Sequence, residues 1–201
     1  MTSGCEREGM ADDLVASAAQ VHDRAWEVLR FWLQDTPKKD RFAKDEAFDA
    51  KIAERFGPLR DDVLASGAKG WTDDPVELLA AIVLLDQFSR NIHRGTARAF
   101  EGDELALSLA KLAVANCWDA GMSVLERQFL YLPFEHAETS EAQRESVRLF
   151  TELGDAEALR YARDHQAVID RFGRFPSRNA VLGRDSTPDE KEYLSQPGAG
   201  W

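Results

Sequence analysis

The stretch TDDPVELLAAIVLLDQF, from Thr72 to Phe88, decides the fold class of this 201-residue chain. It opens with acidic residues that can cap a helix and with Pro75 in the first turn, where proline is well tolerated. The residues from Leu78 to Leu85 are then all aliphatic. A helix without a polar face must be covered on every side, so this one is predicted to lie at the centre of the protein. The aliphatic run is far too short to span a membrane.

The segments on both sides of this helix also show helical periodicity, with clear start and stop signals. No stretch alternates apolar and polar residues as a half-buried strand would. Helices are expected at 12–34, 40–56 (up to the breaker Gly57-Pro58), 73–88, 103–118, 123–135, 140–153, 155–172 and 188–195. The sequence therefore predicts an all-α protein, with a leader at 1–11 and a single domain at 12–201. About seven or eight helices would pack there as helical hairpins.

Local signals also predict where several helices begin and which side chains are buried. Serine or threonine followed three residues later by glutamate or glutamine is typical of a capping box. Such boxes are expected at Ser123–Glu126, Ser140–Gln143 and Thr187–Glu190, with a single cap at Asp155. The apolar side chains nearest the polar motifs are expected to be buried: Leu79, Ile82, Leu85, Phe88, Leu130, Phe134 and Phe172.

The net charge of −11 narrows the range of partners. A protein this acidic is not expected to bind nucleic acid or an anionic membrane through its overall charge. The charge is uneven, because residues 86–98 hold three arginines and one acid, and residues 160–184 hold six arginines and two acids. Neither segment contains lysine. Arginine is the residue whose planar fork binds carboxylates and phosphates through two parallel hydrogen bonds.

Cysteine usage and the N-terminal residues give no sign of export. Cys5 and Cys117 do not form a disulfide framework or a thiolate metal motif, and Cys117 is expected to be a buried free thiol on a helix. Residues 1–13 lack the apolar stretch of a signal peptide. We therefore expect a cytoplasmic protein, with Met10 as an alternative start.

One pattern, Asp-x-Phe-x-Arg-x-x-x-Arg, occurs twice, as DQFSRNIHR (86–94) and DRFGRFPSR (170–178). Each copy can be read as the end of a helix, because arginine near a C-terminus meets the negative end of the helix dipole. The second arginine of each copy is not needed for that role. Two such loops facing one another would either neutralise buried carboxylates or hold an anionic ligand. The ligand-binding candidates are Asp86, Arg90, Asn91, Arg94, Asp170, Arg174, Arg178 and Asn179.

The histidines supply candidates for acid–base chemistry. His136 directly follows Glu135, and His165 directly follows Asp164 on an apolar helical stripe. A histidine on such a stripe is either a core residue or a group that faces a cleft. No HExxH or Cys-x-x-Cys spacing is present, so no metal and no other cofactor is expected. Phosphate-binding glycine loops and nucleophile elbows are also absent.

The segments LLDQFSRNIHRGTARAF, ERQFLYLPFEHAE and RFGRFPSRNAVLGRDSTPDE resemble the bacterial family called domain of unknown function 924. The resemblance extends from about Trp26 to Pro197. It implies an all-helical fold similar to tetratricopeptide-repeat superhelices, without an established activity. The chain departs from the family at Ser89, where members read DQFPRN, and at Ser177, where they read FPHRN. At His93 the family often has an aromatic residue.

Three functions are compatible with these observations. The first is a binding protein that holds a small anionic molecule or an acidic peptide end between the two arginine loops. The second is a protein-interaction scaffold, which rests on fold analogy alone. The third is a hydrolase or transferase acting on an anionic substrate, with His136 or His165 as general base, oriented by Glu135 or Asp164. The direction in which the arginines point distinguishes a shared cleft from separate ion pairs.

Overall fold

The computed structural model describes residues 19–200, which contain helices and no strand. The predicted leader, Cys5, Met10 and the expected helix start at 12–18 lie outside these residues. The first helix covers residues 19–29. The elements that follow are η1 (Arg30–Asp35), α2 (Lys38–Arg41), α3 (Glu46–Ala65), α4 (Pro75–Ile82), η2 (Val83–Phe88), α5 (Ser89–Ile92), η3 (Ala97–Phe100), α6 (Asp103–Ala115), η4 (Trp118–Gly121), α7 (Val124–His136), α8 (Ser140–Leu153), α9 (Ala156–Phe172), η5 (Pro176–Arg178) and α10 (Pro188–Leu194).

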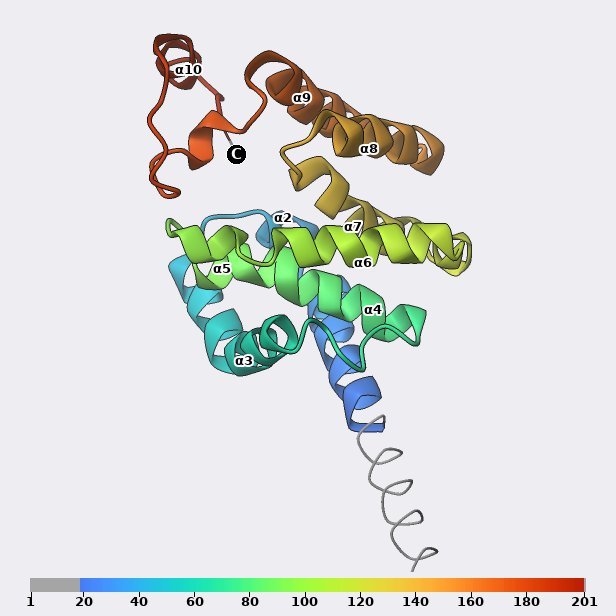
Figure 1. The fold of residues 1–201 in the computed structure, drawn as a ribbon. Coiled ribbons are helices and arrows are strands. Elements are labelled where there is room, and N and C mark those ends of the chain that lie inside the picture. The colour runs from blue at the N-terminus through green and yellow to red at the C-terminus, as the bar shows by residue number, and fades with distance from the viewer. Residues whose placement is uncertain (1–18, 201) are drawn as a thin grey trace, which may run out of the picture.

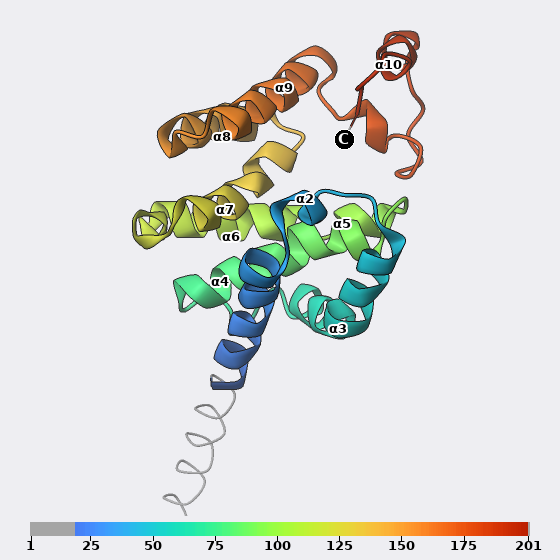
Figure 2. The same cartoon turned by 180° about the vertical axis from the view of Figure 1, so that it is seen from behind.

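The helices are arranged in layers (Figures 1 and 2). One layer contains α4, η2, α5 and α6, and α3 packs against η2 and α5. The α8–α9 hairpin forms the opposite layer, and α7 connects the two because it packs against α6, α8 and α9. Beyond α9, the chain returns through η5 toward the start of α6 before it forms α10. The ends of α5, α7 and α9 and the start of α6 are thereby brought near η5.

The aliphatic helix is central and longer than expected. The elements α4, η2 and α5 follow one another without a break, so the helix runs to Ile92 rather than ending at Phe88. Its middle, η2, is π-helical, a geometry that accommodates one extra residue and is frequent at functional sites. The hydroxyl of Ser89 donates to the carbonyl of Leu84 at 3.4 Å. Arg90 and Asn91 therefore belong to a helix, not to a loop.

The main hydrophobic cluster forms around this helix. The Phe88 ring lies 5.3 Å from that of Trp32 and 5.0 Å from that of Phe56. Of the side chains predicted to be buried, Leu79, Ile82, Leu85, Phe88, Leu130 and Phe134 are buried. Phe172 is half-buried and belongs to a smaller cluster with Val168, Ile169, Phe175 and Tyr193. This small cluster joins the end of α9 to α10.

The structure differs from the sequence prediction at α3, which continues through Pro58 to Ala65 instead of ending near residue 56. Proline in a helix interior removes one hydrogen bond and usually kinks or breaks the helix. Here the buried face continues on both sides of the proline, through Ile52, Phe56, Arg60 and Val63. Packing of that face stabilises the helix across the missing bond.

Helix starts are mostly as predicted. The capping boxes at Ser123 and Thr187 and the cap at Asp155 are confirmed. The box expected at Ser140 is wrong, because Thr139 is the capping residue of α8 and its hydroxyl accepts from the amide of Ala142.

Cys117 is exposed, which contradicts the expected buried thiol. The helix α6 ends at Ala115, earlier than predicted, and Cys117 adopts a left-handed conformation with φ of 55°. Among residues 19–200, no helix combines the length and apolarity needed to cross a bilayer.

Candidate functional site

Two arginines of the repeated pattern meet at one carboxylate, that of Asp103 at the start of α6. Arg90, from α5, binds both oxygens of Asp103, at 2.9 and 3.0 Å. Arg178, from η5, donates to Oδ2 of Asp103 at 3.2 Å. The Phe100 ring lies near both guanidiniums, 5.6 Å from Arg90 and 4.6 Å from Arg178. The two copies of the pattern are thus joined through a residue that belongs to neither.

Asp86 is fully buried in η2 and binds His136. Its Oδ1 lies 2.7 Å from Nδ1 of His136 and 3.0 Å from Nη1 of Arg90, while Oδ2 accepts from Gln87 at 2.6 Å. Burial acts to raise the pKa of Asp86, but Arg90 and His136 outweigh it and hold that pKa below its ordinary value. The carboxylate therefore only accepts hydrogen bonds. It follows that Nδ1 of His136 carries a proton and Nε2 keeps its lone pair.

The last turn of α7 presents Glu135 next to His136. Backbone carbonyls at this helix end lack partners within the helix. Nε2 of Gln143 donates to the carbonyls of Glu135 and Ala137, at 2.7 and 2.8 Å. Nη2 of Arg178 donates to the carbonyl of His136 at 3.0 Å. The position of this turn is therefore set by side chains from α8 and η5.

His165 faces the same cluster from α9. Its Nδ1 lies 2.9 Å from the carbonyl of Tyr161 and 3.3 Å from Oε1 of Glu135. Its ring centroid is 6.1 Å from that of His136, and the Phe175 ring meets it edge-on at 5.5 Å. Glu135, His136 and His165 each offer one potential metal-ligand atom, and these three atoms lie within 4.8 Å of one another.

Burial shifts the pKa values of the titratable groups in this cluster toward their neutral forms. It raises the pKa of Glu135 to about 8 and lowers that of His165 to about 3. It also lowers the pKa of His136. At neutral pH, Glu135 is therefore protonated and both histidines are neutral. Burial lowers the pKa of Arg178 to about 10, which still leaves that guanidinium charged.

The cluster retains some access to solvent. The side chains of Arg90, His136 and Arg178 are 21%, 15% and 13% exposed. Glu135 and His165 lie deeper, with side chains 5% and 8% exposed. A small molecule that reached the cluster would therefore meet the arginines and His136 first.

The structure brings half of the predicted site residues together. The converging residues are Asp86, Arg90, Glu135, His136, His165 and Arg178. The others have separate surroundings: Asn91 and Arg94 bind Asp49 of α3, Arg174 and Asn179 bind Glu190 of α10, Asp164 pairs with Arg160, and Asp164 and Asp170 are exposed. The two copies of the pattern are therefore not equivalent in space.

Sequence reasoning missed Asp103 and Gln143. Asp103 resembles any acidic residue in the first turn of a helix, and Gln143 was assigned to a capping box. Arg178, a partner of Asp103, lies 75 residues away in sequence. Gln143 binds carbonyls only six and eight residues before it, but across the loop that joins α7 to α8. No local spacing signals such contacts.

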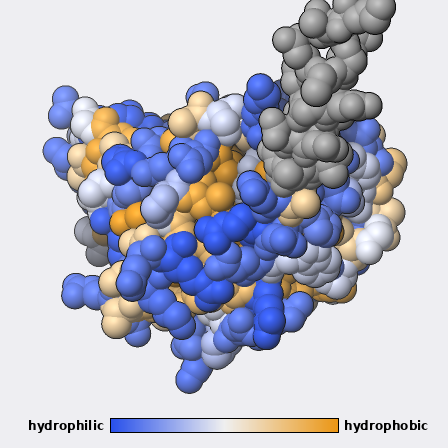
Figure 3. Space-filling model, turned by 90° about the horizontal axis from the view of Figure 1, so that it is seen from below, coloured by the Kyte–Doolittle hydropathy of each residue, from blue (hydrophilic) through white to orange (hydrophobic). Residues whose placement is uncertain are grey.

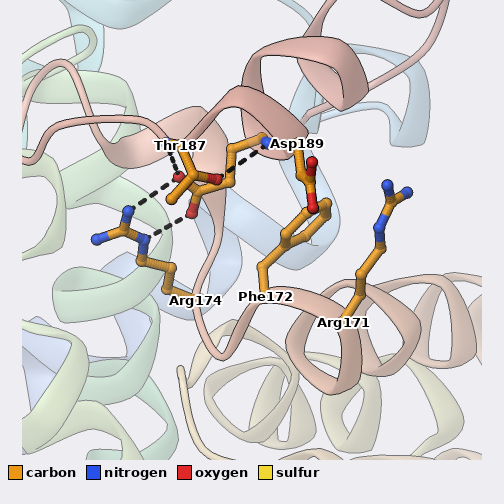
Figure 4. Close-up of a pocket in the computed structure, with 6 residues that line it drawn as sticks. Arg171, Phe172, Arg174, Thr187 and Asp189 are labelled. Carbon is orange, nitrogen blue, oxygen red and sulfur yellow. Dashed lines mark hydrogen bonds and ion pairs between the residues drawn. The ribbon is translucent and has the colours of Figure 1, made fainter.

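A hollow of about 450 Å³ lies away from the cluster, between the end of α9 and α10 (Figure 4). Its lining residues are Arg171, Phe172, Arg174, Thr187, Asp189 and Glu190. Nε and Nη2 of Arg174 donate to the two carboxylate oxygens of Glu190, at 2.7 and 2.9 Å. Arg171 lies on the other side of Phe172 and turns away from this pair. The hollow contains no histidine, and its best-placed cation is already paired.

The Arg174–Glu190 pair leads to a prediction about pH. The hydrogen bond from Arg174 holds the pKa of Glu190 at about 2, below the ordinary 4.5. A depressed pKa stabilises the fold above the ordinary value and loses this contribution as pH falls from about 4.5 to about 2. Arg174→Ala should therefore lower the urea midpoint of unfolding at pH 7. It should also make that midpoint depend less on pH between about 4.5 and about 2.

The matched control is Arg171→Ala, which removes a neighbouring arginine that does not pair with Glu190. Urea titrations at several pH values, followed by circular dichroism, measure both effects. Equal pH profiles for Arg174→Ala and the wild-type protein would show that the pair contributes nothing.

Fold and cluster together define an all-helical protein with a buried, mutually bonded set of acidic, basic and imidazole groups. Residues 28–198 match the sequence profile described as bacterial protein of unknown function (DUF924), and the chain belongs to this family. It is similar to a solved structure, the protein of unknown function ATU0120 from Agrobacterium tumefaciens. That match has 38% sequence identity and a TM-score of 0.79, and it covers 90% of this chain and 98% of that chain. No curated protein matches the chain.

Proposed function

We propose that this protein is a hydrolase or transferase in which His136, held by Asp86, activates a water molecule or a substrate hydroxyl. The observation that carries the proposal is the 2.7 Å contact between Nδ1 of His136 and Oδ1 of the buried Asp86. A carboxylate in this position fixes the tautomer and ring orientation of a histidine and leaves Nε2 as the reactive nitrogen. The partial exposure of His136 supports access to it.

Arg90 and Arg178 support a reaction in which negative charge develops on the substrate. Both guanidiniums lie beside His136 and retain some exposure. A guanidinium has five N–H donors, and the contacts of Arg178 with Asp103 and the His136 carbonyl use only its Nη1 and Nη2. Donors fixed next to a reactive imidazole would stabilise negative charge that develops during the reaction.

A purely anion-binding role has less support. Each of the four arginines of the repeated pattern already has a carboxylate partner: Asp103 for Arg90 and Arg178, Asp49 for Arg94 and Glu190 for Arg174. No surplus positive charge is left to hold an anion by itself.

An interaction scaffold built on tetratricopeptide-like packing, in the cytoplasm, stays an alternative proposal. The stacked hairpins α7–α8 and α8–α9 and the exposed Trp26 and Phe42 support it. On the face shown in Figure 3, hydrophilic side chains predominate and hydrophobic ones form only small areas between them, which gives it little further support.

The test is hydrolysis of chromogenic phosphate, sulfate and carboxylate-bearing esters by the purified full-length protein. Wild type should turn over at least one class, and His136→Gln should lower kcat/KM by about 100-fold or more. His22→Gln is the matched control, since His22 lies on the first helix away from the cluster, and it should stay within about twofold of wild type. Retained activity in a folded His136→Gln protein, or no turnover of any class, would refute the proposal.

A further inference from the structure

The residues Glu135, His136 and His165 combine two imidazoles and one carboxylate at the junction of α7 and α9. Their three ligand atoms lie within 4.8 Å of one another. Two histidines and one carboxylate are a frequent ligand set for zinc and for other divalent first-row metals, with a further position left for water. The spacing in sequence differs from HExxH, because Glu135 and His136 are adjacent and His165 comes from the next helix but one. Motif reasoning therefore gave no indication of a metal.

The surroundings of both histidines fit a metal site. A ligating histidine usually donates its second ring N–H to a carboxylate or a backbone carbonyl, which orients the ring. Nδ1 of His136 faces the buried Asp86 at 2.7 Å, and Nδ1 of His165 faces the carbonyl of Tyr161 at 2.9 Å. In His136, the tautomer with the proton on Nδ1 leaves the lone pair on Nε2.

Glu135 supplies an independent observation. Its side chain is buried, and among the described residues no lysine or arginine forms an ion pair with it. Isolated buried carboxylates are costly unless they are neutralised by a proton or a cation. The contact of Oε1 with Nδ1 of His165 at 3.3 Å leaves the second carboxylate oxygen for such a cation.

Two other groups of histidine and acids are less suitable. Both ring nitrogens of His22 already have partners, Glu77 for Nδ1 and Trp26 for Nε2. The acids near His93, Asp61 and Glu101, are paired with Arg60 and Arg98. The first of these groups therefore provides a matched control.

We infer that Glu135, His136 and His165 bind one divalent transition-metal ion, with zinc as the best match to the two nitrogen ligands and one oxygen ligand. This inference deepens the proposed function, on which it rests for the reaction class, and it assigns the activation of water to the bound ion instead of to Nε2 of His136. The bound ion would take the lone pair of His136 and lower the pKa of a bound water, which would lose its proton to solvent and become the nucleophile.

The first test is binding of the metal alone to wild-type protein stripped by a chelator. Calorimetric titration with Zn²⁺ should give one site, and Co²⁺ should give the visible absorption of a low-symmetry site. X-ray absorption of the zinc-loaded wild type should show nitrogen and oxygen ligands, two of them imidazoles. This last measurement needs no variant, so it does not depend on how substitutions affect folding.

The second test compares variants that circular dichroism shows to be folded. His165→Gln should weaken zinc binding by about 100-fold and Asp86→Asn by about 10- to 100-fold, while His22→Gln should leave it unchanged. The absence of a saturable single site, or a site lost in His22→Gln but kept in His165→Gln, would overturn the inference.

The outcomes separate this inference from the proposed function. If zinc bound at these residues but no ester were turned over, the proposed function would be refuted and the inferred metal site would stand. Full turnover by the chelator-stripped protein would refute the inferred metal site and leave His136 as the general base.

Discussion

Replacing Asp86 by asparagine is expected to lower the free energy of unfolding by about 3 to 5 kcal/mol, because the change breaks a buried ion pair from one side. Asp86 is fully buried and contacts His136, Arg90 and Gln87 through its two oxygens. An amide of the same shape carries no charge to compensate Arg90. The NH₂ group of asparagine would also face the donors of His136, Arg90 and Gln87, which need an acceptor at this position.

The repeated sequence pattern supplies a matched control for this experiment. Asp170 occupies the same position in the second copy but is exposed on α9. Asp170→Asn should therefore change stability by no more than about 0.5 kcal/mol. Urea unfolding of both variants, followed by tryptophan fluorescence, measures the difference. Similar effects of the two substitutions would contradict the buried-pair account of Asp86.

Arg60→Ala should have an effect of comparable size, on the order of 3 to 5 kcal/mol, at a position that the sequence did not single out. Arg60 is completely buried within α3. It donates to Ser89 at 2.9 Å, to Asp61 at 2.8 Å and to the carbonyl of Arg98 at 3.3 Å, and it also binds Glu101. Alanine would remove these bonds and leave a cavity beside the π-helical turn.

Arg98→Ala is the control for Arg60, since Arg98 binds the same two carboxylates, Asp61 and Glu101, from an exposed position. Exposed ion pairs contribute at most about 1 kcal/mol, so this variant should be close to wild type. Arg60→Met, which fills the space without the charge, should recover part of the loss. If Arg60→Ala were no more destabilising than Arg98→Ala, the buried guanidinium would not be a stabilising element.

Most of the fold could be predicted from the sequence, because helix periodicity and capping are local properties. The starts at Ser123, Asp155 and Thr187 follow from the hydrogen-bonding capacity of single side chains. The errors occurred where tertiary packing overrides a local signal. The helix α3 continues past Pro58 because its buried face continues, and this periodicity was present in the sequence.

The candidate site could be predicted only in part. Glu135, His136 and His165 carried visible chemistry, and all three belong to the cluster. The repeated pattern suggested that its two copies face one another as equals. In the structure, Arg90 from the first copy meets Arg178, the second arginine of the second copy, at Asp103. Which carboxylate an arginine finds depends on the packing of distant helices, and the sequence pattern holds no information about that.

The π-helical turn η2 also bears on how chains of this family can vary in length. Deleting one residue between Val83 and Phe88 would turn η2 into a regular α-helical turn and keep Arg90 and Asn91 facing Asp103 and Asp49. The same deletion within α4 would instead rotate everything after it by about 100°, because an α-helix turns by that angle per residue. Gaps in the connection 66–74 would have no such effect. The extra residue lets one continuous helix place the aliphatic side chains of α4 in the hydrophobic core at its start and Arg90 and Asn91 against their carboxylate partners at its end.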